Sequence, residues 1–181
     1  MKQTLDGQES DMEFRRDIRI EDFDPEFHSS LLRDWLNRPH VARWWGDPQR
    51  ALEMSLRQSR NACAIIAVNR TPVGYICWQT LSQDERKAAG LTDLSADCVD
   101  IDILVGDPEV VGQGIGTAAL SLLLERLRSE GIAEVAGVGT SVANQDAIRA
   151  FEKAGFSLFR EFQDPEFGLS QYMTVAMCGA V

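Results

Sequence analysis

The residues with the clearest chemical potential lie in one segment, 100–117. Asp100 and Asp102 alternate there with apolar residues as in a strand, so their carboxylates share one face. An apolar helix is predicted to begin shortly afterwards, and between them lie three glycines at alternate positions, Gly112, Gly114 and Gly116. Glycine lets the main chain adopt positive φ and approach an anion closely. A strand end, a glycine turn and a helix start predict a phosphate site made of main-chain N–H groups.

The two carboxylates are suited to binding a cationic amine. Two residues apart on a strand, they lie about 6.5–7 Å from each other, where each raises the pKa of the other and both attract a dication. An alkylammonium with a pKa near ~10 must lose a proton before its nitrogen can attack, whereas the reference pKa of Asp is near ~3.9. We therefore expect Asp102 to hold the ammonium and pass its proton through water. The alternative is that both carboxylates point into solvent.

Composition restricts the class of protein. The chain has 181 residues, enough for one domain with a sizeable core, and 44% hydrophobic with 25% charged residues is typical of a globular protein. No apolar run approaches the ~20 residues that span a bilayer. The net charge of -10 disfavours nucleic acid and anionic membranes as partners and favours a cation, although solubility alone would also explain it.

The ends of the chain and its cysteines indicate a cellular compartment. Residues 1–11 are polar and acidic without an apolar segment, so we expect a disordered leader rather than a secretory signal, followed by one domain over 12–181. The four cysteines are scattered, and three of them lie in apolar, strand-like runs. This pattern predicts buried, reduced thiols and a cytoplasmic location.

The elements that position these residues follow from hydrophobic periodicity and turn residues. Helices are predicted over 26–37, 48–59, 115–130 and 144–154. Strands are predicted over 14–20, 63–68, 73–81, 98–105, 134–138, 156–162 and 172–177. The polar segment 82–97 is expected to be a long, mobile connection. The order indicates a mixed α/β fold with hairpins at both ends of a central β-α-β-α unit.

Two motifs resemble those of the GNAT superfamily of acyl-CoA N-acyltransferases. Residues 111–117, Val-Gly-Gln-Gly-Ile-Gly-Thr, resemble its pyrophosphate loop, although Val111 stands where the superfamily usually has Gln or Arg. Residues 144–156 resemble its second signature, Asn-x-x-Ala followed by an aromatic residue and Gly-Phe. The resemblance covers residues 14–177. It implies the GNAT fold, with a mixed, mostly antiparallel, twisted sheet of about six to seven strands flanked by about four helices.

The resemblance also implies acetyl-CoA as co-substrate and no metal. The diphosphate would lie on the glycine turn, and the thioester would lie against the end of the central strand, where a main-chain N–H would polarise its carbonyl. The residues then expected to contact the coenzyme are Leu104, Val105, Val111, Gly112, Gln113, Gly114, Ile115, Gly116, Thr117, Asn144, Ala147 and Phe151.

Within the superfamily the chain is most similar to the aminoglycoside 6′-N-acetyltransferases. The similarity lies in His-Val-Ala-Arg-Trp-Trp-Gly at 40–46, in Ile-Asp at 101–102, and in 112–117 and 151–156. It implies that Asp102 contacts and activates the amine. Because segment 40–46 follows Pro39, we expect a loop in which Trp44 or Trp45 walls the substrate cleft and stacks on a sugar face or cation. Asp100, Trp44 and Trp45 are thus expected to bind substrate, with plain packing of both tryptophans as the alternative.

Phe151 departs from the pattern of the family, which usually has Tyr there as proton donor to the leaving thiolate. Phe cannot donate, but a thiolate whose thiol has a pKa near ~8.5 is a tolerable leaving group without a donor. Tyr172 or Tyr75 could replace it, and a packing role for each is the alternative.

The predicted function is transfer of an acetyl group from acetyl-CoA to a primary amine of a cationic small molecule, such as the 6′-amine of an aminoglycoside, by a monomer or homodimer. One alternative is a siderophore-pathway acyltransferase acting on hydroxylysine, whose relatives have His where Asp102 stands. Another is a non-catalytic acyl-CoA-binding module, which Phe151 favours.

Overall fold

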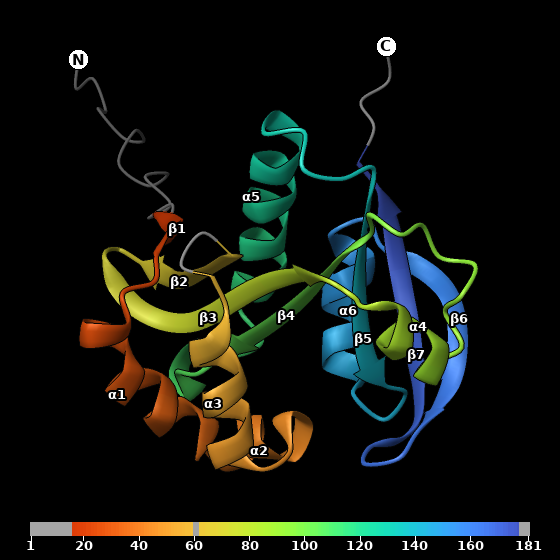
Figure 1. Ribbon diagram of the computed structural model, residues 1–181. Coiled ribbons are helices and arrows are strands. Elements are labelled where there is room, and N and C mark those ends of the chain that lie inside the picture. The colour runs from red at the N-terminus through yellow and green to blue at the C-terminus, as the bar shows by residue number, and fades with distance from the viewer. Residues whose placement is uncertain (1–15, 60–61, 178–181) are drawn as a thin grey trace, which may run out of the picture.

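The computed structural model describes residues 16–59 and 62–177, which are coloured in Figure 1. They form one seven-stranded sheet in the order β1-β2-β3-β4-β5-β7-β6. The strands are β1 (Ile18–Asp22), β2 (Cys63–Val68), β3 (Thr71–Thr80), β4 (Val99–Val105), β5 (Val135–Ser141), β6 (Ser157–Asp164) and β7 (Gly168–Ala176). The helices are α1 (Pro25–Leu36), α2 (Pro39–Trp45), α3 (Pro48–Arg57), α4 (Gln83–Ala88), α5 (Ile115–Ser129) and α6 (Gln145–Lys153).

Helices cover both faces of the sheet, with α5 behind it and α1 to α3 in front of it in Figure 1. The alternation along β4 explains the two layers, because Val99 and Ile101 pack with α5 whereas Leu104 packs with α1 and α3. Asp100 and Asp102 share the face of Leu104. The sequence predicted this division of β4 correctly.

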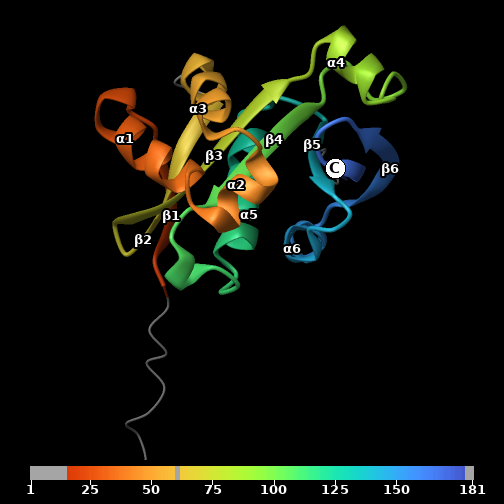
Figure 2. The same ribbon diagram turned by 90° about the horizontal axis from the view of Figure 1, so that it is seen from below.

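The sheet is divided at one position. All neighbouring strands pair antiparallel except β4 and β5, which are parallel. That parallel pairing holds only from Val99 with Ala136 to Asp100 with Gly137, whereas β5 stays paired with β7 up to Ser141. Beyond Asp100 the two strands separate, and Figure 2 shows β4 and β5 running apart. This separation positions the candidate site.

Two helices of the structure were not predicted, which explains why the described residues form six helices rather than about four. Residues 40–46 were expected to be a loop, but α2 begins at Pro39, where proline occupies the first helical turn instead of ending a helix. The expected mobile connection contains α4, whose start is fixed by a reciprocal capping box between Ser82 and Glu85. The sheet and its mostly antiparallel pairing agree with the prediction.

The predicted hairpin and the predicted burial of the cysteines agree with the described residues. The hairpin of β2 and β3 is confirmed, and it turns through Asn69 and Arg70, both at positive φ. Cys63, Cys77 and Cys98 are buried, as predicted. The expected leader at 1–11 lies outside the described residues, as does Cys178. Within the described part of the chain, no helix has the length and apolar character needed to cross a bilayer.

Candidate active site

A cleft of about 690 Å³ occupies the space where β4 and β5 separate. Its floor includes Ile101 to Val105 of β4, and its opposite wall includes Gly139 to Ser141 of β5. The glycine turn before α5 and the first turns of α6 close one end, while α2, α3 and the loop between β6 and β7 surround the other. The cleft therefore brings the predicted phosphate site and the predicted amine site into one space.

The glycine turn presents unpaired amides to this cleft. Gly112 and Gly114 adopt φ of 77° and 79°, values that disfavour any residue with a Cβ atom. Gly114 caps α5, and the first bond inside this helix runs from the Ala118 N–H to the Gly114 carbonyl. The preceding N–H groups of residues 115–117 thus face outward at the positive end of a fifteen-residue helix. Gly116 is already helical and does not need positive φ, unlike the other two.

Most of the predicted coenzyme residues line the cleft, and one does not. Those on its surface are Leu104, Val105, Val111, Gly112, Gly114, Ile115, Gly116, Thr117, Asn144, Ala147 and Phe151. Gln113 is absent from the lining. Its N–H donates to the Val110 carbonyl and its side-chain amide donates to the Glu109 carbonyl, so it closes the turn. Gln113 is thus the one predicted coenzyme residue that the structure does not place at the cleft.

Residues of the two predicted motifs fix the start of α6 and attach it to α5. Asn144 is the N-cap of α6, and its side-chain oxygen accepts from the Ala147 N–H at 3.3 Å. Thr117 donates its hydroxyl to the Ala150 carbonyl at 3.3 Å, which ties α5 to α6. Phe151 is 5% exposed and packs against Phe156 in the core behind the sheet. Phe151 thus serves the packing of α6 while one side of it borders the cleft.

Helix α2 is fastened to the end of β4 by two side chains. Arg38 donates to the Gly106 carbonyl at 2.8 Å, and Nε2 of His40 lies 3.1 Å from the Val105 carbonyl oxygen. His40 also lines the cleft. Sequence reasoning did not identify this contact, because nothing near residue 40 indicates which strand the helix meets.

Both tryptophans of α2 line the cleft and are half-buried. The Arg43 guanidinium lies over the Trp44 ring, 4.4 Å from its centroid. Trp45 packs in addition against the core formed by α1, α3 and the sheet. The expected position of the pair at the cleft wall is thus observed, although on a helix and not on a loop.

The two carboxylates lie in different environments. Asp102 lines the main cleft and is exposed to it, while Asp100 lines a smaller adjoining cavity of about 210 Å³ that Asp102 also borders. Tyr172 donates its hydroxyl to Oδ1 of Asp100 at 2.8 Å. The surrounding protein limits the hydration of both groups and raises the pKa of each, and the charge of Asp102 raises that of Asp100 further. The alternative that both point into open solvent is not supported.

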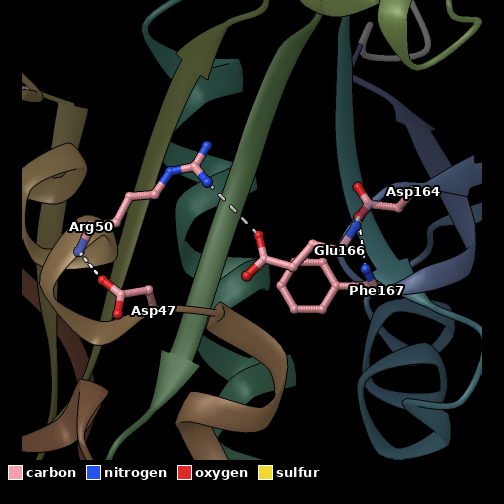
Figure 3. Close-up of polar contacts among 5 residues, drawn as sticks. All are labelled: Asp47, Arg50, Asp164, Glu166 and Phe167. Carbon is pink, nitrogen blue, oxygen red and sulfur yellow. Dashed lines mark hydrogen bonds and ion pairs between the residues drawn. The ribbon is translucent and has the colours of Figure 1, made fainter.

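The loop between β6 and β7 closes the acceptor end of the cleft. Asp164 accepts from the N–H groups of Glu166 and Phe167, both at 2.8 Å, and this turn directs Glu166 toward α3 (Figure 3). There Glu166 approaches Arg50, with 4.0 Å between Oε2 and the guanidinium nitrogen. A side chain at Gly46, which has φ of 70°, would overlap the Glu166 carboxylate. The acidic residues of this loop, like Arg50, were not identified from the sequence.

A family model described as an acetyltransferase (GNAT) domain matches residues 24–164, which include the cleft walls from α2 to β6. The chain belongs to the GNAT acetyltransferase family. The predicted family, fold and enzyme class are confirmed.

Relatives of known activity lie within the GNAT family. The curated aminoglycoside N(6′)-acetyltransferases type 1 of Klebsiella pneumoniae and of Serratia marcescens are each 29% identical to this chain, over 72% of its length and 70% of theirs. The structure of AAC(6′)-Ib in complex with ribostamycin and coenzyme A has a TM-score of 0.73 at 24% identity, covering 88% of this chain and 93% of that one. The aminoglycoside N(6′)-acetyltransferase of Legionella pneumophila has a TM-score of 0.68 at 16% identity, with 88% and 92% covered. These structures share the fold of this GNAT chain.

Proposed function

We propose that this GNAT protein transfers an acetyl group from acetyl-CoA to a primary amine of a cationic small molecule of the amino-sugar type, with the 6′-amine of an aminoglycoside as the leading acceptor. The supporting observation is that a single cleft joins the amides of the glycine turn to the carboxylate of Asp102. The names of the two curated relatives support the same acceptor class.

The residues of the turn fit a diphosphate. Space is open beside Gly112 and Gly114, where a Cβ atom would otherwise project, so an anion can approach the main chain. The outward N–H groups at the start of α5 add hydrogen bonds and the positive end of the helix dipole. When bound, acetyl-CoA supplies the acetyl thioester. Leu104 and Val105 border the cleft between the turn and Asp102, and a main-chain N–H there would polarise the carbonyl.

The acceptor end fits a polyamine. Asp102, Asp164 and Glu166 supply negative charge, while the rings of Trp44 and Trp45 supply flat apolar surfaces for a sugar ring. Arg50 is the partner of Glu166, and a substrate ammonium can compete with it for that carboxylate. The acidic character of this end agrees with a cationic substrate and disfavours an anionic one.

Acetyl transfer by direct attack of the amine on the thioester needs no covalent enzyme intermediate. The substrate ammonium gives one proton to Asp102, directly or through water, and its nitrogen lone pair then attacks the thioester carbon. As the C–N bond forms and the C–S bond breaks, the attacking nitrogen gives its second proton to water and the departing thiolate takes a proton from water. An amide, a free thiol and the proton on Asp102 result. Phe151 offers no proton, Tyr75 is fully buried away from the cleft, and the Tyr172 hydroxyl is bound to Asp100.

Two other functions would require or be favoured by different residues in this cleft. A siderophore-pathway acyltransferase acting on hydroxylysine is expected to have His at the position of Asp102, and this cleft has a carboxylate there. A non-catalytic acyl-CoA-binding module is favoured only by Phe151. The buried Cys63, Cys77 and Cys98 support a reducing compartment, the cytoplasm, as the place of the reaction.

The test combines calorimetry with acetyl-CoA and a thiol-release assay over a panel of aminoglycosides, polyamines and hydroxylysine. Binding of acetyl-CoA with turnover of an aminoglycoside supports the proposal. Binding without turnover of any amine supports the module, and turnover of hydroxylysine alone with longer acyl chains supports the siderophore branch.

A further inference from the structure

Tyr172 reaches the central strand across an intervening one. It belongs to β7, where it pairs with Gly139 of β5, yet its hydroxyl binds Asp100 on β4. The path is open because β5 has glycine at 137, the register partner of Asp100, and a methyl group there would overlap the Tyr172 hydroxyl. At Gly139 a Cβ atom would make only an ordinary contact of 3.7 Å with the Tyr172 ring, so Gly137 is the glycine that this path requires. Gly137 therefore leaves the space through which Tyr172 reaches Asp100.

The contact lies where the sheet divides. Asp100 is the last residue of β4 that pairs with β5, and Asp102 is the first acidic residue beyond that point. Tyr172 is only 3% exposed, so its hydrogen bond to Asp100 is shielded from water. The bond fixes the Asp100 carboxyl within the small cavity that it shares with Asp102.

The ionisable groups that border the small cavity come from four elements. Asp100 and Asp102 lie on β4, Tyr172 on β7, Asp164 on β6 and Glu85 on α4, and all of them border the small cavity. The thiols of Cys98 and Cys77 are also close, since Sγ of Cys98 lies 4.0 Å from the Tyr172 hydroxyl and both thiols are influenced by the charge of Asp100. Arg86 of α4 lies near Cys98 and donates to the Leu94 carbonyl. The described lining of the cavity includes no cationic side chain to neutralise the pair.

We propose that Tyr172 is a positioning residue, which holds the Asp100 carboxyl beside Asp102 so that the two carboxyl groups act as one proton-accepting unit for the acceptor amine. Two close carboxyls that share one cavity lose their protons in two separated steps that belong to the pair. The N–H bond of the substrate ammonium breaks, and a carboxylate oxygen of this unit binds the released proton. When both carboxyls are ionised, the pair binds a proton more tightly than one carboxylate alone.

This inference rests on the proposed function, but its first test does not use substrate. The protein carrying ¹³C-labelled aspartate is titrated by NMR, and Asp100→Asn and Asp102→Asn assign the two carboxyl resonances. We expect both wild-type residues to titrate above the usual range in coupled steps. Asp102→Asn should lower the Asp100 midpoint by about one pH unit, since the negative charge of Asp102 that raises the pKa of Asp100 is lost. Tyr172→Phe should raise the Asp100 midpoint, because the hydrogen bond that favours the ionised form is lost.

Tyr75→Phe is the matched control. It removes a hydroxyl from a fully buried tyrosine of β3 that packs against Phe23, away from the small cavity, and should leave both midpoints unchanged. Thermal unfolding checks that each variant is folded. An Asp100 midpoint that is the same in wild type and Asp102→Asn would overturn the proposal. So would an Asp100 midpoint that does not respond to Tyr172→Phe.

A second readout applies once acetyl transfer has been measured. The acid limb of kcat/KM should move to lower pH in Asp100→Asn and to higher pH in Tyr172→Phe, and kcat should change more than KM. If the NMR steps behave as expected but no amine is acetylated, the carboxyl unit stands and the proposed function fails. If amines are acetylated and the acid limb is identical in all three proteins, Tyr172 has only a structural role.

Discussion

Arg50 and Glu166 form an ion pair across the mouth of the cleft, with 4.0 Å between guanidinium nitrogen and carboxylate oxygen (Figure 3). Arg50 comes from α3 and Glu166 from the loop between β6 and β7, so the pair joins the two halves of the sheet in front of β4. Their side chains are 73% and 51% exposed, and such pairs contribute less than about 1 kcal/mol to stability. The ion pair has a larger effect on the charge at the mouth of the cleft, since Arg50 offsets the negative charge of Glu166 that an entering substrate meets.

Variants of this pair should change KM in opposite directions. Glu166→Gln removes a negative charge from the cleft and should raise KM for a cationic acceptor several-fold, whereas Arg50→Ala removes the competing cation and should lower it. The free energy of unfolding should change by less than about 1 kcal/mol in both. Arg19→Ala, which breaks the exposed pair with Asp17, controls for a general loss of charge. KM changes of the same sign in both variants would contradict this electrostatic role.

The glycine turn allows stability to be separated from coenzyme binding. Gly114→Ala should cost about 1 kcal/mol because of its positive φ, and it should also weaken acetyl-CoA binding at least tenfold by placing a methyl group over the amides. Gly131→Ala is matched, since Gly131 has φ of 63°, open space around it and a position at the far end of α5. It should lose the same stability and keep its affinity. Equal affinities of the two variants in calorimetry would remove the turn from coenzyme binding.

The two tryptophans should respond differently to truncation. Trp45 packs against the core as well as lining the cleft, so Trp45→Ala should lower stability by about 1–3 kcal/mol and raise KM. Trp44 contacts Arg43 at the cleft wall, so Trp44→Ala should raise KM with a stability loss below about 1 kcal/mol. Thermal unfolding and steady-state kinetics measure both. A purely thermal effect of both changes would mean that the tryptophans only pack.

Asp102→Asn should reduce kcat/KM by ~10²-fold or more, because the amide can neither accept the proton nor attract the ammonium. Asp34→Asn, on the exposed surface of α1, is the matched change outside the cleft and should leave kinetics unaltered. The thiol-release assay measures both. Unchanged kinetics in Asp102→Asn would exclude this carboxylate from the mechanism.

The raised pKa of Asp100 gives a signed prediction for stability. A carboxyl whose pKa is higher in the folded than in the unfolded protein binds more protons when folded, so its contribution to stability is present at low pH and is lost as pH rises through the folded value. Asparagine at 100 keeps an oxygen for Tyr172 but does not titrate. The stability of Asp100→Asn relative to wild type should therefore increase between about pH 4 and pH 8. Parallel pH dependences of the two proteins in denaturant titrations would contradict the raised pKa.

Local signals in the sequence predicted the central part of the fold. The alternation of Val99 to Val105, the glycine turn and the caps at Asn144 and Gly131 all act within a few residues, and the corresponding elements are observed. The two unpredicted helices also had local signals. Ser82 and Glu85 have the spacing of a capping box, and proline is favoured at the first position of a helix as well as after its end.

Contacts between distant elements were not predictable in the same way. The position of Glu166 opposite Arg50 depends on how β6 and β7 lie relative to α3, which no local pattern determines. The hydrogen bond of Tyr172 to Asp100 has a trace in the sequence, since Gly137 and Gly139 alternate in an apolar strand, but glycine there does not reveal which side chain occupies the space.

The attachment of α2 to β4 constrains how the substrate range of this acetyltransferase can evolve. Arg38 and His40 bind the carbonyls of Gly106 and Val105, so the helix that carries the tryptophans is held by the strand that forms the floor of the cleft. A shift of that helix to admit a bulkier amine would also disturb the floor of the cleft, where we propose that the acetyl donor lies. New acceptors are therefore expected to be gained by exchanging the tips of single side chains, such as those of Trp44 and Glu166, and not by replacing whole segments.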